Sequence, residues 1–237
     1  MPTVAAVLKE LKSLGSESTR KIFARHGADP ERMYGVKGAD LKQVLKKIKG
    51  DQELALGLYA SGNYDAMYLA GLAADGGAMT KKALQDWARQ ATWQMIAEYS
   101  VPGVAAESPH GPALATKWID AKKEHVASCG WATWAALVSV LPDDELDLDR
   151  LEALLERVEE ELPGAPNRVR YTMNGFVIAV GSYVKPLVPR AKATARRLGK
   201  VEVDMNGTAC KVPLASDYIL KVEKAKRTGR KRKTAKC

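Results

Sequence analysis

Apolar residues recur at helical spacing along almost the whole chain, and this periodicity constrains the fold more than any other feature. In the stretches 41–48 and 151–162, apolar residues stand at positions such as i, i+3, i+4 and i+7. This spacing gathers them on one face of an α-helix. Segments of about 10 to 18 residues with this pattern are joined by short turns, which predicts antiparallel pairs of helices.

The helical pairs predict an all-α fold, an α-solenoid of HEAT-like helical hairpins that covers residues 1–200. A globular helical bundle is the alternative, because no strict sequence repeat is visible. In a solenoid, alternate helices line a concave face. Basic residues on that face would form a groove for a nucleic-acid backbone.

The C-terminal part of the chain departs from the helical pattern. Residues 201–212 alternate in character on both sides of Asn206-Gly207, which predicts a small β-hairpin with a type I′ turn. We expect this hairpin and a short helix, residues 201–223, to pack on the solenoid. Residues 224–237 contain eight Lys or Arg and no acid. That composition predicts a basic, disordered tail.

The charge of the chain is unevenly distributed. The formal net charge is +9, although residues 143–161 alone carry −8. A basic body, one acidic helix and a basic tail predict a polyanionic partner, with nucleic acid first and a membrane surface second. No apolar run approaches the roughly 18 residues of a membrane span, and the N-terminal segment lacks the features of a signal peptide. We therefore expect a cytoplasmic, nucleoid-associated monomer that binds duplex DNA.

No pattern in the sequence indicates a cofactor. Cys129, Cys210 and Cys237 are far apart and show no C-x-x-C spacing, and the three histidines are equally scattered. The glycine-rich motifs of nucleotide-binding sites are not present in the sequence. We expect neither a metal nor a nucleotide cofactor.

The stretch 87–108 is the most aromatic part of the chain. Trp87, Trp93 and Tyr99 form a stripe at helical spacing, in a long helix that opens at residue 80 and is broken at Pro102. Glu98 lies beside this stripe. The rings fill a core between packed helices, or they line a cleft in which the Glu98 carboxylate stabilises a nearby cation.

The chain resembles the AlkD-type DNA alkylation repair family of HEAT-like repeat proteins over most of residues 15–200. The resemblance is carried by Tyr34-Gly35-Val36 and the helix with Leu41, by Leu54-Ala55-Leu56-x-Leu58-Tyr59-x-Ser61-Gly62-x-Tyr64-Asp65, and by Trp87 and Trp93. It implies a helical solenoid whose basic concave face holds duplex DNA. The best-known members are DNA glycosylases that remove cationic N3- and N7-alkylated purines.

The resemblance also implies roles for individual residues. In such glycosylases an aspartate and two tryptophans stabilise an oxocarbenium-like state. Trp93 matches one ring, and Trp131 or Trp134 would supply the other. The family's aspartate follows its tryptophan by four residues, where this chain has Ala97, and Glu98 comes one residue later. One residue turns a helical side chain by about 100°, so Glu98 replaces the aspartate only if the helix is wound or rotated differently.

We therefore predict a DNA alkylation repair protein that binds duplex DNA in a basic concave groove and excises N3- or N7-alkylated purines if it is an active glycosylase. The alternatives are a non-catalytic DNA-binding or damage-recognition protein, and a protein-interaction solenoid. The catalytic candidates are Glu98, Trp93 and Trp131. The DNA-binding candidates are Tyr34, Lys37, Lys46, Lys47, Trp134, Arg168, Arg170, Lys231, Arg232 and Lys233.

Overall fold

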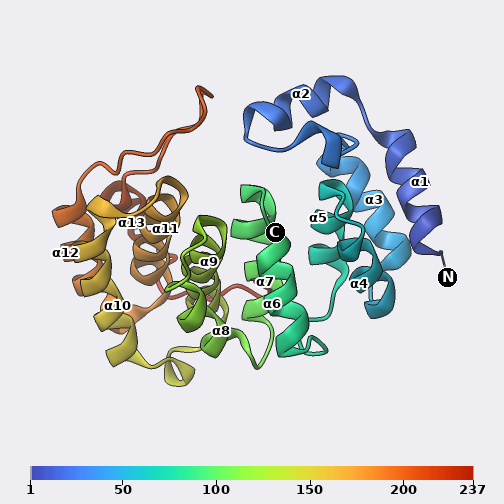
Figure 1. The fold of residues 1–237 in the computed structure, drawn as a ribbon. Helices are drawn as coiled ribbons and strands as arrows, with labels where there is room; N and C mark the ends of the chain where they lie inside the picture. Colours follow the sequence, from blue (N-terminus) through green and yellow to red (C-terminus); the bar gives the residue numbers. More distant parts are fainter. Residues whose placement is uncertain (1, 237) are drawn as a thin grey trace.

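The computed structural model describes residues 2–236, and within them the regular structure is entirely helical (Figure 1). The all-α fold class is thus confirmed. The helices are α1 Val4–Leu14, α2 Glu17–Arg25, α3 Gly38–Ile48, α4 Gln52–Ala60, α5 Tyr64–Ala73, α6 Lys81–Gln90, α7 Val101–Ala106, α8 Gly111–Trp118, α9 Glu124–Val140, α10 Leu148–Glu161, α11 Asn167–Tyr183, α12 Val188–Leu198 and α13 Ala215–Lys224. Short 3-10 turns lie at Pro30–Arg32, Asp143–Glu145, Leu162–Gly164 and Lys185–Leu187.

From α4 onward the helices alternate between two layers. The inner layer consists of α5, α7, α9, α11 and α13, and each of them contacts the next. Each outer helix, from α4 to α12, packs on the inner helix that follows it in the chain. This repeated pairing is the predicted α-solenoid rather than a globular bundle. None of the helices in residues 2–236 is long and apolar enough to cross a membrane.

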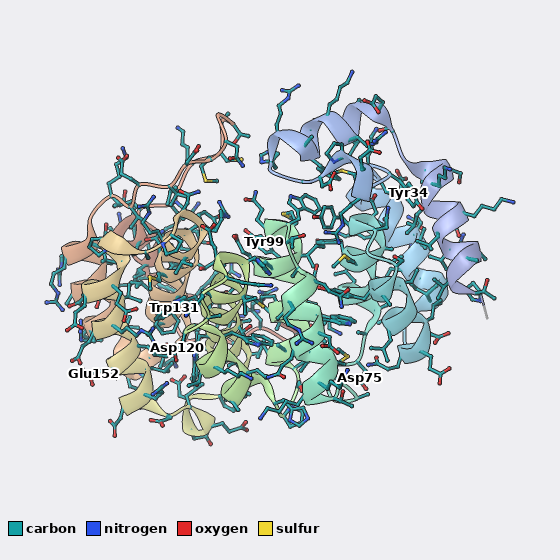
Figure 2. All side chains as sticks on the ribbon, in the orientation of Figure 1. Tyr34, Asp75, Tyr99, Asp120, Trp131 and Glu152 are labelled. Carbon is teal, nitrogen blue, oxygen red and sulfur yellow. The ribbon has the colours of Figure 1, made fainter. Side chains whose placement is uncertain are left out.

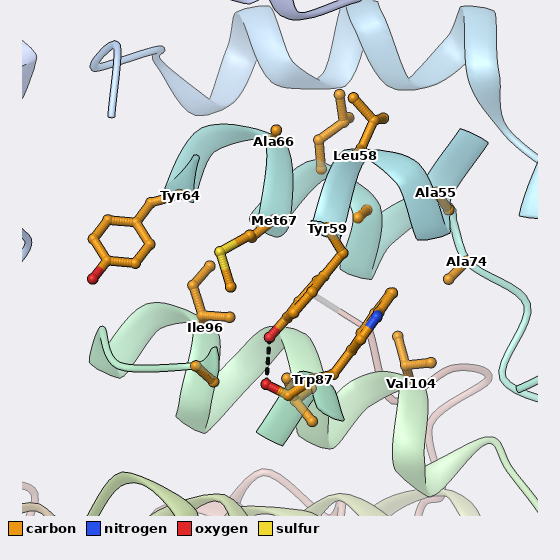
Figure 3. Packing of buried hydrophobic residues seen from close by; sticks show 14 of the residues in the cluster. Ala55, Leu58, Tyr59, Tyr64, Ala66, Met67, Ala74, Trp87, Ile96 and Val104 are labelled. Carbon is orange, nitrogen blue, oxygen red and sulfur yellow. Dashed lines mark hydrogen bonds between the residues drawn. The ribbon is translucent and has the colours of Figure 1, made fainter. Parts of the chain in front are cut away.

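The apolar stripes of the sequence become the buried faces of the helices. Buried positions of α3 and α10 are Leu41, Val44, Ile48, Leu151, Leu154, Leu155 and Val158. Many N-termini are capped by a side-chain oxygen, as where Asn63 accepts a hydrogen bond from the Ala66 amide. In the N-terminal half of the core the rings of Tyr59 and Trp87 stack 3.9 Å apart, and the Tyr59 hydroxyl donates to the Trp87 carbonyl (Figure 3).

The expected long helix over the aromatic stretch is wrong in two places. The helix stops at Gln90, because the Thr92 hydroxyl bonds to Arg32 and Tyr64 and holds a non-helical turn. A new helix then continues through Pro102, instead of ending there. Residues Ile96–Ser100 form a wide π-helical turn, which accommodates a proline that cannot donate the usual backbone hydrogen bond.

Residues 201–214 form an extended loop rather than the predicted β-hairpin. The tight turn is present, since Asn206 and Gly207 both have the positive φ angles, 54° and 67°, that a type I′ turn requires. No β-ladder flanks this turn within the described residues. Side chains of α11 hold the loop instead. The Asn167 side chain bonds to both the amide and the carbonyl of Asp204, and the Asn174 amide donates to the Pro213 carbonyl.

The basic tail packs on the body of the protein, unlike the disordered segment that its composition predicts. It runs along the C-terminal ends of the inner helices α11, α9, α7 and α5. Its amides donate to the Ser182 and Ser139 carbonyls and to Glu107, and the Lys236 ammonium reaches the Ala74 carbonyl. The C-terminal ends of helices have unpaired carbonyls and a partial negative charge. A basic extended segment donates hydrogen bonds to these carbonyls and compensates the charge.

Glu107, at the end of α7, anchors the tail through the Thr234 hydroxyl, the Ala235 amide and the Lys236 ammonium. We expect Glu107→Ala to lower the free energy of unfolding by about 2 kcal/mol, since hydrogen bonds to a charged group are lost. For a chain of this size, that loss lowers the melting temperature by roughly 4–8 °C. Thermal unfolding followed by circular dichroism measures the shift. Glu160→Ala, at an exposed position of α10, is the matched control, and equal shifts would show that the tail does not stabilise the body.

Candidate functional site: a concave groove

Three hollows follow one another along the inner layer and form a groove. The first, which we call the aromatic hollow, has a volume of about 540 Å³ and lies between α2, α3, α5, the π-helical turn, α11 and the 201–214 loop. The second, the middle hollow, is about 330 Å³ and lies over α9 and α11. The third, the basic hollow, is about 270 Å³ and lies between α11, α13 and the tail. Tyr99, labelled near the middle of the molecule in Figure 2, lines both of the first two hollows.

The aromatic hollow is built around Trp93. The rings of Phe23 and Tyr64 both pack against Trp93, and each ring centroid lies 5.4 Å from that of Trp93. The indole N–H of Trp93 donates to the His26 carbonyl at 3.1 Å, which fixes the ring against the end of α2. Trp87 and Trp93 both belong to the N-terminal core cluster, and Trp93 also lines the cleft.

Asp65 positions the N-terminal wall of the groove. Its buried carboxylate accepts hydrogen bonds from three consecutive amides, those of Tyr34 at 2.6 Å, Gly35 at 3.0 Å and Val36 at 2.9 Å. Gly35 has a φ of 77°, a conformation that favours glycine, and this allows the backbone to curl around the carboxylate. The loop between α2 and α3 is thereby pinned to α5, so that α2 overhangs the aromatic hollow.

Glu98 is paired with Arg168 at the floor of the groove. The two side chains form a bidentate ion pair, with the Arg168 Nε and Nη2 atoms 2.7 and 2.6 Å from the two Glu98 carboxylate oxygens. The exposed fraction of the Glu98 side chain is 2%. Burial raises the pKa of the Glu98 carboxyl, and the hydrogen bonds and charge of Arg168 lower it only in part. The guanidinium also stacks on Tyr171, 4.3 Å from the ring centroid.

The π-helical turn explains why Glu98, rather than Ala97, meets Arg168. A π-helix contains more residues in each turn than an α-helix, so side chains after the turn are rotated relative to regular winding. Ala97 is 1% exposed and belongs to the core cluster, whereas Glu98 lines the middle hollow. The π-helical winding begins at Ile96, and whether Glu98 replaces the family's aspartate stays a prediction.

The structure corrects the placement of the second tryptophan. Trp131 is completely buried and packs against Phe176 in the C-terminal core cluster, so its ring does not line the groove. Trp134 is 7% exposed and belongs to the same cluster. Both rings lie on faces of α9 that pack against neighbouring helices, and a pattern of helical spacing does not tell a core face from a cleft face. Tyr171 is the ring that stands beside the ion pair.

The structure brings only some of the predicted DNA-binding residues to the groove. Arg168 lines the aromatic hollow and Arg232 lines the middle one. Lys47 pairs with Glu10 of α1, and Lys231 with Asp143. The others do not line these three hollows: Tyr34, Lys37, Lys46, Trp134, Arg170 and Lys233.

Sequence reasoning missed several residues that line the groove. Tyr171 follows Arg168 by three residues, and this spacing was a signal that both lie on one helical face. Lys211 lines the aromatic hollow from the 201–214 loop. Lys221, Arg227 and Arg230 line the basic hollow. No local sequence pattern predicts that these three side chains lie around one hollow. Within residues 2–236, no cluster of three His, Cys, Asp or Glu side chains is arranged to hold a metal ion.

The chain is similar to a known protein family, to two bacterial proteins and to a solved structure. Residues 7–197 match the model of a family described as DNA alkylation repair enzyme. Uncharacterised proteins of Listeria innocua and Listeria monocytogenes are each 35% identical over 217 residues, which is 90% of this chain and 93% of either relative. A solved structure, described as a new family of proteins related to the HEAT-like repeat DNA glycosylases with affinity for branched DNA structures, is 35% identical. It superposes with a TM-score of 0.90 over 100% of both chains.

The Glu98–Arg168 ion pair should contribute to the free energy of unfolding. We expect Glu98→Gln to lower the free energy of unfolding by about 3 kcal/mol, because it leaves the Arg168 guanidinium without its counter-charge. The double variant Glu98→Gln/Arg168→Gln should lose less than the sum of the single variants, with a coupling of about 1–3 kcal/mol. Urea unfolding measures both, with Glu53→Gln at an exposed position as the control. Additive losses would show that the two side chains do not interact.

Proposed function

The chain belongs to the DNA alkylation repair enzyme family, and from that premise we propose that it binds DNA, including branched DNA, in the concave groove without cleaving a glycosidic bond. The single observation that carries the proposal is the Glu98–Arg168 ion pair. In this pair the Arg168 guanidinium neutralises the Glu98 carboxylate, whose free negative charge a glycosylase would need. The groove otherwise suits DNA.

The charge distribution supports a DNA backbone in the groove. Lys211, Lys221, Arg227 and Arg230 line it, and none of them has an ion-pair partner among residues 2–236. The acidic residues of α10 lie in the outer layer, where several pair with Arg190, Arg197 and Arg157. The groove therefore keeps its positive charge, which favours a phosphate backbone.

The aromatic hollow supports contact with unpaired bases. Its rings and its volume of about 540 Å³ suit an unstacked nucleobase, and stacking on an aromatic side chain contributes about 1–3 kcal/mol per base. Branch points and other interruptions of a duplex expose such bases. A base in this hollow would lie beside Trp93, Tyr99 and Tyr171.

The position of the 201–214 loop supports a preference for interrupted duplexes. The loop extends across the top of the molecule toward α2 (Figure 1). The Asn206 amide would lie within 3.3 Å of a Cβ placed on Gly27, so the tip of the loop meets the end of α2. A continuous straight duplex in the groove would have to pass this crossing, whereas a branch offers a gap between its arms. The solved relative described as having affinity for branched DNA agrees with this preference.

The ion pair is the reason for proposing that the DNA remains intact. Cleavage of an N-glycosidic bond develops positive charge on the sugar, and a negatively charged carboxylate stabilises that charge. Here the Arg168 guanidinium already neutralises Glu98, and a second cation beside it would be repelled. Ala97, at the position of the family's aspartate, has no carboxylate to contribute.

We expect the protein to bind a four-way junction more tightly than a linear duplex of the same sequence. Log affinity should fall linearly with log salt, by about 0.9 for each phosphate neutralised on duplex DNA. Lys211→Gln should reduce this slope by about 0.9, since one cation leaves the groove. Fluorescence anisotropy measures the affinities, with Lys12→Gln on the exposed face of α1 as a control of equal charge. A flat response to salt would contradict binding through phosphates.

We further expect no release of alkylated base from methylated duplex DNA above the spontaneous rate. Wild type and Glu98→Gln should behave alike, because Glu98 stabilises the fold rather than the reaction. Chromatography of the released bases is the measurement. Release by wild type that is lost in Glu98→Gln would identify a glycosylase and overturn the proposal of binding without cleavage.

A further inference from the structure

The basic hollow lies at the C-terminal end of the groove and differs in character from the other two. It is lined by the end of α11, by α13 and by residues 225–230 of the tail. Three of its eight lining residues are cations, Lys221, Arg227 and Arg230, and none is an acid. The aromatic and middle hollows are lined mainly by apolar and aromatic side chains.

The three cations converge without a counter-charge from the protein. None of them forms an ion pair with a described residue, and two acidic side chains of the same region are paired with other lysines. Glu223 is already paired with Lys192 at 2.9 Å. Asp143 is paired with Lys231 at 2.8 Å. Like charges held together repel one another, so this arrangement favours an anion from outside the chain.

A buried hydroxyl in the same hollow also lacks a partner. Ser182 is 3% exposed and lines the hollow, yet its Oγ atom has no hydrogen-bond partner. Buried polar groups are nearly always satisfied, so an orphaned donor beside three cations points to a ligand that carries acceptors. A phosphate oxygen is such an acceptor.

The tail holds the two arginines in a defined turn. The Gly229 amide donates to the Ser182 carbonyl at 2.8 Å, and the Arg230 amide donates to the Arg227 carbonyl at 3.1 Å. Gly229 adopts a φ of 74°, which glycine permits without strain. Backbone hydrogen bonds thus hold the segment of the tail that carries Arg227 and Arg230 at the edge of the hollow.

The basic hollow is continuous with the groove. Tyr183 and Tyr218 line both the basic hollow and the middle hollow, and Tyr99 and Tyr171 line both the middle and the aromatic hollow. A nucleic-acid strand that follows the groove away from the aromatic hollow would therefore reach the basic hollow last.

We propose that the basic hollow is a phosphodiester-binding site that holds the backbone of a second DNA arm where it leaves the groove at a branch. The proposal rests on the DNA-binding function inferred above. The Arg227, Arg230 and Lys221 side chains bind the phosphate oxygens, and the Ser182 hydroxyl donates the remaining hydrogen bond. The site adds affinity for a branched substrate, whose second arm reaches it, and little for a linear duplex held at the aromatic hollow.

The test is the double variant Arg227→Gln/Arg230→Gln, measured on a four-way junction and on a linear duplex of the same sequence. The matched control, Lys9→Gln/Lys12→Gln on the exposed face of α1, removes the same charge at a distance from the groove. We expect Arg227→Gln/Arg230→Gln, called the groove variant below, to lose tenfold or more in junction affinity. The slope of its log affinity against log salt on the junction should fall by about 1.8. Its affinity for the linear duplex should fall by clearly less than its affinity for the junction. Unchanged thermal unfolding shows that both variants are folded.

Two further measurements identify the chemistry. Ser182→Ala should weaken junction binding about tenfold, as expected for a lost hydrogen bond to a charged group. Inorganic phosphate, compared with chloride at equal ionic strength, should compete with the junction for wild type but not for Arg227→Gln/Arg230→Gln.

The outcomes separate this site from the function on which it rests. Wild type that binds neither DNA would overturn the proposed function itself. Wild type that binds the junction, with groove and control variants that lose affinity equally, would overturn the basic hollow alone. An equal loss on junction and linear duplex would overturn its assignment to a second arm. Competition by phosphate that persists in the groove variant would place the phosphate elsewhere.

Discussion

The ion pair between Glu98 and Arg168 is the interaction on which the groove depends. It joins the π-helical turn in the middle of the chain to the start of α11, and so links the two core clusters across the floor of the groove. Opposite charges are stable in a poorly solvated site only when their geometry is close and their hydrogen bonds are satisfied, as they are here. The same geometry that joins the two halves underlies the proposal that DNA is bound and left intact.

Local patterns were enough to predict the helices and much of their packing. The stripe of Leu41, Val44 and Ile48 is buried because residues at these spacings must share one face of a helix. The turn at Asn206-Gly207 also formed as predicted, since few residue pairs adopt two successive positive φ angles. The resemblance to a repair family was confirmed. For the helices and the turn, the signal lies within a few residues of the structure that it predicts.

The remaining features depend on partners that are distant in sequence. Glu98 and Arg168 are separated by 70 residues, and Asp65 and the amides that it binds by about 30. Trp131 was a candidate for the groove because aromatic residues have the same helical spacing in the sequence whether they face a core or a cleft. The prediction of a disordered tail was wrong for another reason. Its composition is that of a disordered segment, but its structure comes from carbonyls that the inner helices leave unpaired at their ends.

The packed tail has a consequence for how the molecule holds together. In a repeat protein each unit contacts only its neighbours, so an array is free to unravel from one end. Here residues 229–236 contact the ends of α11, α9, α7 and α5, and Lys236 meets a carbonyl 162 residues earlier in the chain. These contacts form only after every helix has been synthesised, and closing such long loops slows folding. In return, the tail couples the repeats from α5 to α11, so that this part of the array opens as one cooperative unit.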